Sequence, residues 1–241
     1  MRRLTLALSY YDQPQMLARQ IETWLSYPAD VRERMTFIVV DDGSPRFPAE
    51  DVVRAARVSL NLYRIDHDKR WGWPQARNLA LHEAPEGWVL MTDMDHILGP
   101  EQAERALSVP LREGCAYLPA RRKPDDSPWK PHQDSFLLER STFWRTGGYD
   151  LRFVGWYGTS SIFRNRLAMM TPLIMTEAFH QTVYNLGGEN LSDIPDAGVT
   201  GMGRKGSEHH VSRCPELAPL KKTAHLELPG DPLAFPWHRV V

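Results

Sequence analysis

Two pairs of aspartates follow apolar segments and could together hold a divalent cation. Asp41 and Asp42 follow the segment MTFIVV, and Asp93 and Asp95 follow the segment WVLMT. Carboxylates placed close together repel one another unless a cation neutralises them. Hard oxygen ligands suit Mg²⁺ or Mn²⁺, and such ions usually bring a phosphate group with them. The residue types therefore predict a metal and phosphate site, provided that the fold brings the two segments together.

Apolar segments alternate with helix-favouring segments in the N-terminal half of the chain. Strands are predicted at 4–9, 35–40, 60–65 and 88–92, and helices from Pro14 with Asp12 as the capping residue, at 49–56 and from Pro74. This alternation is typical of βα units and of a mostly parallel sheet with helices on both faces. Ligands bind at the carboxyl ends of the strands in such sheets. Both aspartate pairs and the segment SYYDQP are therefore expected at one edge of the sheet.

The second half of the chain has a looser pattern. Further strands are predicted at 115–120, 135–139 and 173–179, short helices at 140–148 and 160–167, and a long polar loop at 121–134. From residue 187 onward the chain is rich in Gly, Pro and His and shows little periodicity. We therefore predict one α/β domain over residues 1–185. Residues 186–241 are expected to form an irregular extension, a lid or an arm packed on the same domain.

The amino-acid composition limits the partners that the protein is expected to bind and the cellular compartment in which it is expected to work. A formal net charge of −1 argues against a nucleic-acid partner or an anionic membrane surface. Cys115 and Cys214 are too far apart for a zinc cluster, do not make a disulfide framework, and suit a reducing compartment. No stretch approaches the roughly 20 apolar residues of a membrane span, and the first residues do not read as a signal peptide. We therefore expect a cytoplasmic protein.

Five motifs together resemble a known family of enzymes. SYYDQPQML, VVDDGS, WPQARNLAL, MTDMDHI and RTGGYDLRFVGWYG occur in the order and approximate spacing of family 2 glycosyltransferases with the GT-A fold, over about residues 3–185. The resemblance implies a Rossmann-like, mostly parallel sheet flanked by helices. It also implies a UDP- or GDP-sugar donor, a glycan or other hydroxyl acceptor, and Mn²⁺ or Mg²⁺ as the cofactor.

The resemblance assigns roles to individual residues. The nucleotide-binding residues that it implies are Ser9, Tyr10, Asp41, Asp42, Arg77 and Asp93. Asp93 and Asp95 form an Asp-x-Asp motif that meets the metal and the diphosphate, with Asp95 as the expected direct metal ligand. A later histidine often completes this metal site. His180 is preferred over His209 and His210, because it follows a predicted strand at a plausible distance.

The segment GWYGTSSIF departs from the family pattern, in which acidic residues bind the acceptor and one of them takes its proton. Thr159, Ser160 and Ser161 stand where those carboxylates are expected, and a hydroxyl does not act unaided as a general base near pH 7. The base candidates elsewhere are Asp134, Asp150 and Glu177. The alternatives are a retaining reaction, in which the diphosphate accepts the proton, and a nucleotide- or sugar-binding module with little or no turnover. Trp156, Thr159 and Ser160 are the predicted acceptor-binding residues.

Several other features leave two interpretations open. Trp71, Trp73 and Trp129 lie in predicted loops or at their edges, like Trp156, and either stack on sugar rings or pack internally. The basic loop RRKPDDSPWK either approaches an anionic acceptor or is solvated. The segment GVTGMGRKGSEHH could close over the donor. A nucleotidyltransferase, which also uses paired acids and a metal, would need a glycine-rich and basic loop after the first strand, and SYYDQPQM lacks one.

Overall fold

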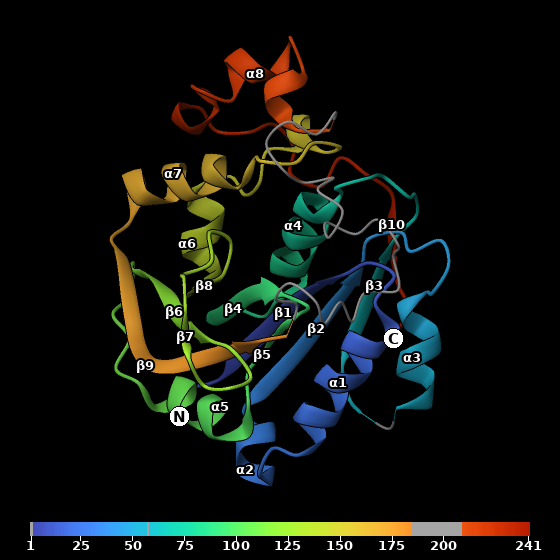
Figure 1. Ribbon diagram of the computed structural model, residues 1–241, viewed down its shortest axis with the longest axis vertical. Helices are drawn as coiled ribbons and strands as arrows, with labels where there is room; N and C mark the ends of the chain where they lie inside the picture. The colour runs from blue at the N-terminus through green and yellow to red at the C-terminus, as the bar shows by residue number, and fades with distance from the viewer. Residues whose placement is uncertain (1, 57, 185–208) are drawn as a thin grey trace.

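A mixed β-sheet forms the centre of the computed structural model, which describes residues 2–56, 58–184 and 209–241 (Figure 1). The strand order is β10-β3-β2-β1-β4-β8-β6-β9-β5, with β7 beside β6. The strands are β1 (Leu4–Tyr10), β2 (Met35–Asp41), β3 (Asn61–Ile65), β4 (Trp88–Asp93), β5 (His96–Ile97), β6 (Ala116–Arg122), β7 (Pro128–Trp129), β8 (Phe136–Glu139), β9 (Leu173–Val183) and β10 (Trp237–Arg239). The four adjoining strands β3, β2, β1 and β4 are parallel, as predicted from the alternation of apolar and helical segments.

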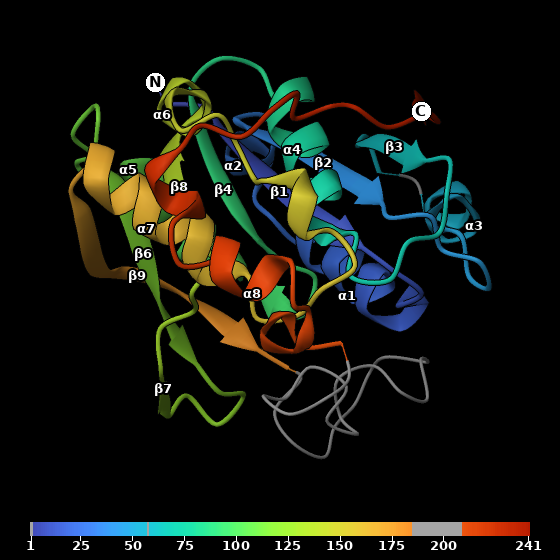
Figure 2. The same cartoon turned by 90° about the horizontal axis from the view of Figure 1, so that it is seen from above.

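Helices cover both faces of these parallel strands. The α-helices are α1 (Pro14–Leu25), α2 (Ala29–Arg32), α3 (Ala49–Ala55), α4 (Trp73–Glu83), α5 (Pro100–Ser108), α6 (Arg140–Arg145), α7 (Ser160–Met170) and α8 (Leu217–Leu220), and the 3₁₀ turns are η1 (Leu151–Phe153), η2 (Val211–Arg213) and η3 (Ala224–Leu226). Figure 2 shows α1 and α4 on opposite sides of β1 and β2.

The core has two main parts because the inner strands are apolar on both faces. Leu6 and Leu8 of β1 pack with Leu17 and Trp24 of α1, whereas Ala7 belongs to the cluster on the other face, together with residues of α4. A strand of continuous rather than alternating hydrophobicity is expected where helices cover both sides of a sheet. Two rigid layers therefore hold the strand ends in place.

The turn between β1 and α1 differs from its prediction. Asp12 does not cap α1, whose N-cap residue is Gln13. The backbone of Asp12 has a φ of 46°, and its carboxylate accepts hydrogen bonds from the backbone N–H groups of Arg46 and Phe47, at 3.2 and 2.8 Å. Asp12 therefore ties the turn after β1 to the loop after β2, and both lie at the carboxyl edge of the sheet.

Three short strands were missed, and one strand is longer than predicted. β5 directly follows the Asp-x-Asp motif and pairs antiparallel with β9. β7 pairs antiparallel with the end of β6 inside the segment predicted as a loop, and β10 pairs antiparallel with β3. β9 continues beyond residue 179 to Val183, alongside β6 and across a register shift between Pro119 and Ala120. Strands of two or three residues carry too little periodicity to be recognised from sequence.

The C-terminal residues pack on the rest of the chain at several separate places. Backbone hydrogen bonds join Tyr157 to His209 and Val211, and buried Arg166 donates to the carbonyl of Ala224 at 2.8 Å. Further along, Asn78 donates to the carbonyl of Pro232, and β10 extends the sheet. The described part of the predicted extension is therefore built into the fold. The predicted boundary at residue 185 lies outside the described residues.

No described helix combines the length and the hydrophobicity that a membrane crossing requires.

Candidate functional site

The register of β1 brings the two aspartate pairs to the same edge of the sheet. Tyr10 lies opposite Asp41 on β2, and Ser9 lies opposite Asp93 on β4. All three strands run parallel, so their carboxyl ends open on the same side. Both aspartate pairs therefore lie at one edge of the sheet, as the sequence predicted, and the backbone of Ser9 and Tyr10 lies between them.

The carboxylate of Asp41 is hydrogen-bonded to other residues of the protein. It accepts hydrogen bonds from the backbone N–H groups of Ser44 and Ala49, at 2.8 and 2.9 Å, and from Arg64 Nη1 at 2.7 Å. These bonds close the loop after β2 and satisfy the first turn of α3. With this set of partners and 1% exposure, Asp41 organises the loop rather than facing a ligand.

Asp42 is also buried, but its side chain lacks such partners. It is 5% exposed, and its Oδ1 atom has no hydrogen-bond partner within the described part of the chain. Burial, followed by the charges of Asp41 and Asp68, raises the pKa of this carboxyl well above its usual value. Gly72 packs so closely that an added Cβ would lie 2.4 Å from Asp42 Oδ1. A buried carboxyl without a partner calls for a ligand that can hydrogen-bond to it.

The guanidinium of Arg77 links the end of β4 to Asp134 and Tyr149, which lie further along the chain. Arg77 projects from α4, is 2% exposed, and pairs closely with Asp93 Oδ1 and with the carbonyl of Asp134. Tyr149 Oη lies 3.1 Å from Arg77 Nη1, and the ring of Trp73 lies 5.0 Å from the guanidinium. Burial alone would lower the pKa of Arg77, but Tyr149, Asp93 and Asp134 outweigh it and raise the pKa, so a permanent positive charge lies beside Asp93.

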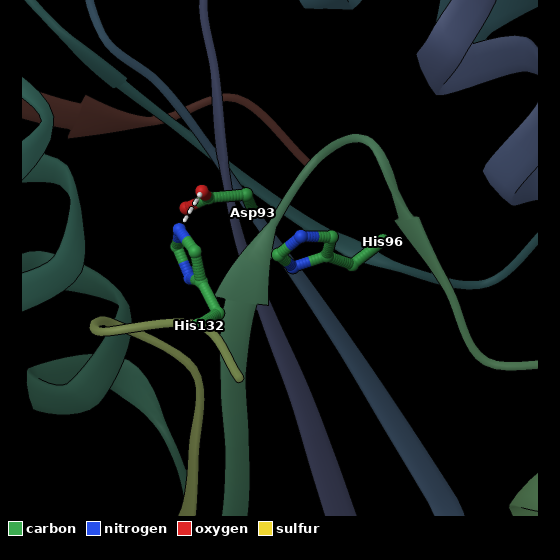
Figure 3. A group of neighbouring side chains, drawn as sticks. All are labelled: Asp93, His96 and His132. Atoms are coloured by element: carbon green, nitrogen blue, oxygen red, sulfur yellow. Dashed lines mark ion pairs between the residues drawn. The ribbon is translucent and has the colours of Figure 1, made fainter. Parts of the chain in front are cut away.

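A group of three side chains around Asp93 could hold a metal ion. One ligand atom from each of Asp93, His96 and His132 lies within 4.8 Å of the others (Figure 3). His132 Nε2 lies 3.2 Å from Asp93 Oδ2. Burial opposes ionisation of Asp93, but His132 and Arg77 outweigh it and hold the pKa of the carboxyl well below its usual value. A carboxylate with imidazoles is a donor set that Mn²⁺ accepts.

The protonation of the two histidines fits metal binding, although the contacts of His96 compete with it. Burial lowers the pKa of both imidazoles, and metal ligation requires the neutral form. Arg121 Nη1 donates to His96 Nε2 at 2.8 Å, and His96 Nδ1 lies 2.8 Å from Thr92 Oγ1. Asp93 and His132 can therefore meet a cation directly, whereas His96 would first have to release Arg121 or Thr92.

The expected direct ligand, Asp95, lies beside this group. Its nearest contact to the group is 3.9 Å, from Oδ1 to His96 Nε2. Burial and the charge of Asp93 raise the pKa of Asp95 to about 7. A cation at the strand end would oppose the repulsion from Asp93 and so lower the pKa of Asp95.

The other histidines predicted as ligands lie elsewhere in the described structure. His180 is on β9, and its Nε2 lies 3.9 Å from Asp126 of the β7 hairpin. His209 and His210 pair with the backbone at Tyr157, and His210 Nδ1 lies 2.7 Å from Ser212 Oγ. The structure brings His96 and His132 to Asp93 instead. His96 directly follows the Asp-x-Asp motif, which was a usable signal, whereas His132 lies in a loop predicted as polar and gave none.

The three base candidates have different surroundings. Asp150 accepts from the backbone N–H of Arg152 and forms an ion pair with its guanidinium at 2.6 Å, so it holds the η1 turn. Glu177 is exposed on β9. Asp134 is 6% exposed, lies 3.4 Å from Tyr149 Oη and accepts a hydrogen bond from the side chain of Ser160. Burial raises its pKa against the opposing charges of Arg77 and His132.

The segment predicted to bind the acceptor, residues 155–163, contacts the loop before α4 through aromatic rings. The rings of Trp71 and Tyr157 lie 5.1 Å apart, and Trp71 has a φ of 53°, a strained conformation for a bulky residue. Thr159 is buried directly before α7, and Trp156 packs on a small apolar cluster that includes Phe153 and Ile162. Trp156 therefore packs internally, and Trp73 does so against Tyr149.

Comparisons with known proteins match this architecture. The family model described as glycosyl transferase family 2 matches residues 5–171. A mannosyltransferase, PcManGT from Pyrobaculum calidifontis, solved in complex with GDP-Man and Mn²⁺, has a TM-score of 0.60 at 20% identity, covering 78% of this chain and 59% of that chain. TarS residues 1–349 from S. aureus, solved in complex with UDP-GlcNAc, has a TM-score of 0.64 at 14% identity, with coverages of 79% and 61%.

These structural likenesses confirm the predicted fold class, a mixed α/β structure with a mostly parallel central sheet flanked by helices, similar to GT-A glycosyltransferases. The chain spans about three fifths of the length of the chains that it matches. No curated protein sequence matches it.

Proposed function

The chain belongs to glycosyl transferase family 2, and from this premise we propose that it is a metal-dependent transferase that moves a sugar from a UDP- or GDP-sugar to a hydroxyl acceptor. One observation carries the proposal. The unpartnered, buried carboxyl of Asp42 and the Asp93 group lie at one sheet edge, on either side of the end of β1. The related structures, solved in complex with GDP-Man and Mn²⁺ and with UDP-GlcNAc, support the donor class.

Asp42 would bind the nucleobase of the donor. Uracil and guanine both present ring N–H donors, and a buried carboxyl oxygen without a partner is stabilised when such a donor reaches it. Ser9 Oγ is likewise buried without a hydrogen-bond partner among the described residues, next to Tyr10 on the same strand end. Asp41 would act on the nucleotide indirectly, by holding the loop that carries Asp42.

The Asp93 group would hold the cation, and Arg77 would face the diphosphate. Asp93 and His132 would supply two of the cation's ligands, because their side chains lie 3.2 Å apart. Asp95, the direct ligand expected from sequence, lies beside this group, whereas His180 contacts Asp126 instead. When bound, Mn²⁺ or Mg²⁺ would neutralise the charge of the leaving diphosphate. Arg77 is held by Tyr149 and by the carbonyl of Asp134, so it would stabilise the same charge without moving.

The acceptor would bind beside Ser160, and Asp134 is the best placed of the three base candidates. It is the only one of Asp134, Asp150 and Glu177 that contacts both Ser160 and the residues around Arg77. Its raised pKa moves a carboxylate toward the range that suits proton transfer near neutral pH. Thr159 and Trp156 would hold the conformation of the acceptor-binding segment through their internal packing.

A second candidate function follows from the same segment. Residues 155–161 contain no carboxylate, so a domain that binds a nucleotide sugar without transferring it is the alternative. This alternative keeps the nucleotide and metal contacts and drops only the transfer step.

Nucleotide release separates the two functions. UDP-GlcNAc and GDP-mannose would each be incubated with the protein in Mn²⁺ or EDTA, and UDP or GDP release measured alongside donor binding. A transferase releases nucleotide from one donor, slowly to water and faster with an acceptor, and only with the metal. Binding without release supports the binding module. Neither binding nor release with either donor contradicts both.

A further inference from the structure

The C-terminal segment that carries α8 lies alongside α7 (Figure 2). A cavity outside the strand-end site is lined by residues of both. Its volume is about 400 Å³, within the range of small-molecule pockets. The polar residues that line it are Ser161, Asn165, Ser212, Lys221, Lys222 and His225. Val211 and Ala218 add a small apolar wall.

The charged residues that line the cavity are basic. None of the residues that line it is acidic. Neither Lys221 nor Lys222 forms an ion pair among the described residues. Burial lowers the pKa of the Lys221 ammonium, and no carboxylate opposes that shift. An anion bound in the cavity would therefore offset the cost of burying the Lys221 ammonium, and Lys222 would add a second positive charge at its exposed side.

Hydrogen-bond donors lie next to these cations. Ser161 and Asn165 are one turn apart on α7, so their side chains share one face of the helix. Thr159 makes no side-chain cap to the first turn of α7 within the described structure. Hydroxyl, amide and ammonium donors around one space match the several acceptor oxygens of a phosphate group better than the two oxygens of a carboxylate.

The cavity adjoins the acceptor side of the site. Ser161, which lines the cavity, directly follows Ser160, whose side chain hydrogen-bonds to Asp134. We propose that this cavity binds a phosphate group carried by the acceptor molecule. The role of the phosphate-bearing molecule as the acceptor rests on the proposed transferase function. The phosphate site itself rests only on the cavity and its lining. The remaining volume would accommodate part of the sugar or polyol that bears the phosphate.

Calorimetric titration in EDTA tests the phosphate site, because the strand-end metal then contributes nothing. The probes are inorganic phosphate and glycerol 3-phosphate. The test variant is the double substitution Lys221→Gln and Lys222→Gln. The matched control, Lys123→Gln and Lys130→Gln, removes the same charge from the basic loop near β7. We expect wild type and control to bind both probes, and the test variant to bind them about tenfold or more weakly.

Three results would overturn the proposal. Equal phosphate binding by wild type and test variant excludes the cavity. Loss of binding only in the control moves the anion site to the basic loop. Binding of inorganic phosphate without binding of glycerol 3-phosphate shows a site for the free ion instead of an acceptor group. Nucleotide binding measured in the same variants is an independent test of the proposed function, because the cavity substitutions leave Asp42 and Asp93 intact. Its failure in wild type would contradict the proposed function and not the phosphate site.

Discussion

The ends of β2 and β4 each carry two aspartates, and in each pair the two carboxyls have different surroundings. At the end of β2, Asp41 is fully paired, while Asp42 has a buried oxygen without a partner among the described residues. At the end of β4, Asp93 is paired with Arg77 and His132, while the pKa of Asp95 is raised to about 7 by burial and by its neighbour. At each strand end, one aspartate is therefore paired, and the pKa of the other, Asp42 or Asp95, is raised.

The partners of the paired aspartates distinguish the two places. Asp41 binds backbone N–H groups of a loop and a helix start, which are fixed by the chain itself. Asp93 contacts two side chains, Arg77 and His132. Arg77 is held in place by other contacts, whereas the imidazole of His132 can shift from Asp93 onto a cation. The end of β2 is therefore expected to be rigid before ligands bind, and the end of β4 is expected to rearrange. The following predictions test this difference.

Asp41→Asn should cause the largest loss of stability. The substitution leaves Arg64 without its buried partner and weakens two bonds to backbone N–H groups. Breaking a buried ion pair on one side costs about 3–5 kcal/mol of the free energy of unfolding, and urea denaturation measures it. The exposed Asp51→Asn serves as the control. A loss below about 1 kcal/mol would show that Asp41 does not hold the loop.

Asp93→Asn should cause the largest loss of activity. The substitution weakens the contact to a cation and the ion pair that positions Arg77. Removing one such electrostatic contact typically lowers turnover by about 100-fold or more. Metal-dependent release of nucleotide from the donor measures the effect. Turnover within twofold of wild type would place the cation elsewhere.

His132→Gln should weaken Mn²⁺ binding, whereas His180→Gln should not. The first histidine lies 3.2 Å from Asp93 and the second faces Asp126 on β9. Loss of a metal ligand or its support costs roughly 10–100-fold in affinity, which paramagnetic broadening or calorimetry with Mn²⁺ can measure. The reverse result, with only His180→Gln impaired, would restore the ligand set expected from sequence.

Asp42→Asn should stabilise the free protein, in contrast to Asp41→Asn. Because the folded-state pKa of Asp42 lies above its ordinary value of 3.8, the folded state holds its proton more tightly than the unfolded state. Wild type therefore loses stability as the pH rises above about 4, and the amide avoids that loss. We expect a gain in the free energy of unfolding at pH 7 that disappears below about pH 4, measured by urea denaturation at several pH values. A loss of stability at pH 7 would contradict this account.

The ends of the parallel strands could be predicted from the sequence because each strand is a short continuous segment with its own apolar pattern. Continuous apolar runs marked β1, β2 and β4, and the aspartates directly after them were expected at one edge. Helix and strand spacing also indicated the order of the elements. The strands β5, β7 and β10 were missed because pairing with other segments, rather than local periodicity, stabilises them.

The division of roles within each aspartate pair could not be predicted. Asp41 and Asp42 are identical in type, and only the position of Arg64 and of the start of α3 shows which is paired. In the same way, His132 comes close to Asp93 through the turn that joins the β7 hairpin to β8, and nothing in its local sequence indicates this. Such contacts depend on packing between distant segments, which residue spacing does not report.

Calorimetric binding of UDP and GDP tests the central claim most directly. Each nucleotide would be titrated into wild type, Asp42→Asn and Asp93→Asn, once with Mn²⁺ and once with EDTA. The account predicts binding of one nucleotide by wild type that is stronger with Mn²⁺, loss of that metal dependence in Asp93→Asn, and weaker binding by Asp42→Asn under both conditions. Metal-independent binding that neither substitution changes would contradict the assignment of the nucleotide and the cation to the ends of β2 and β4.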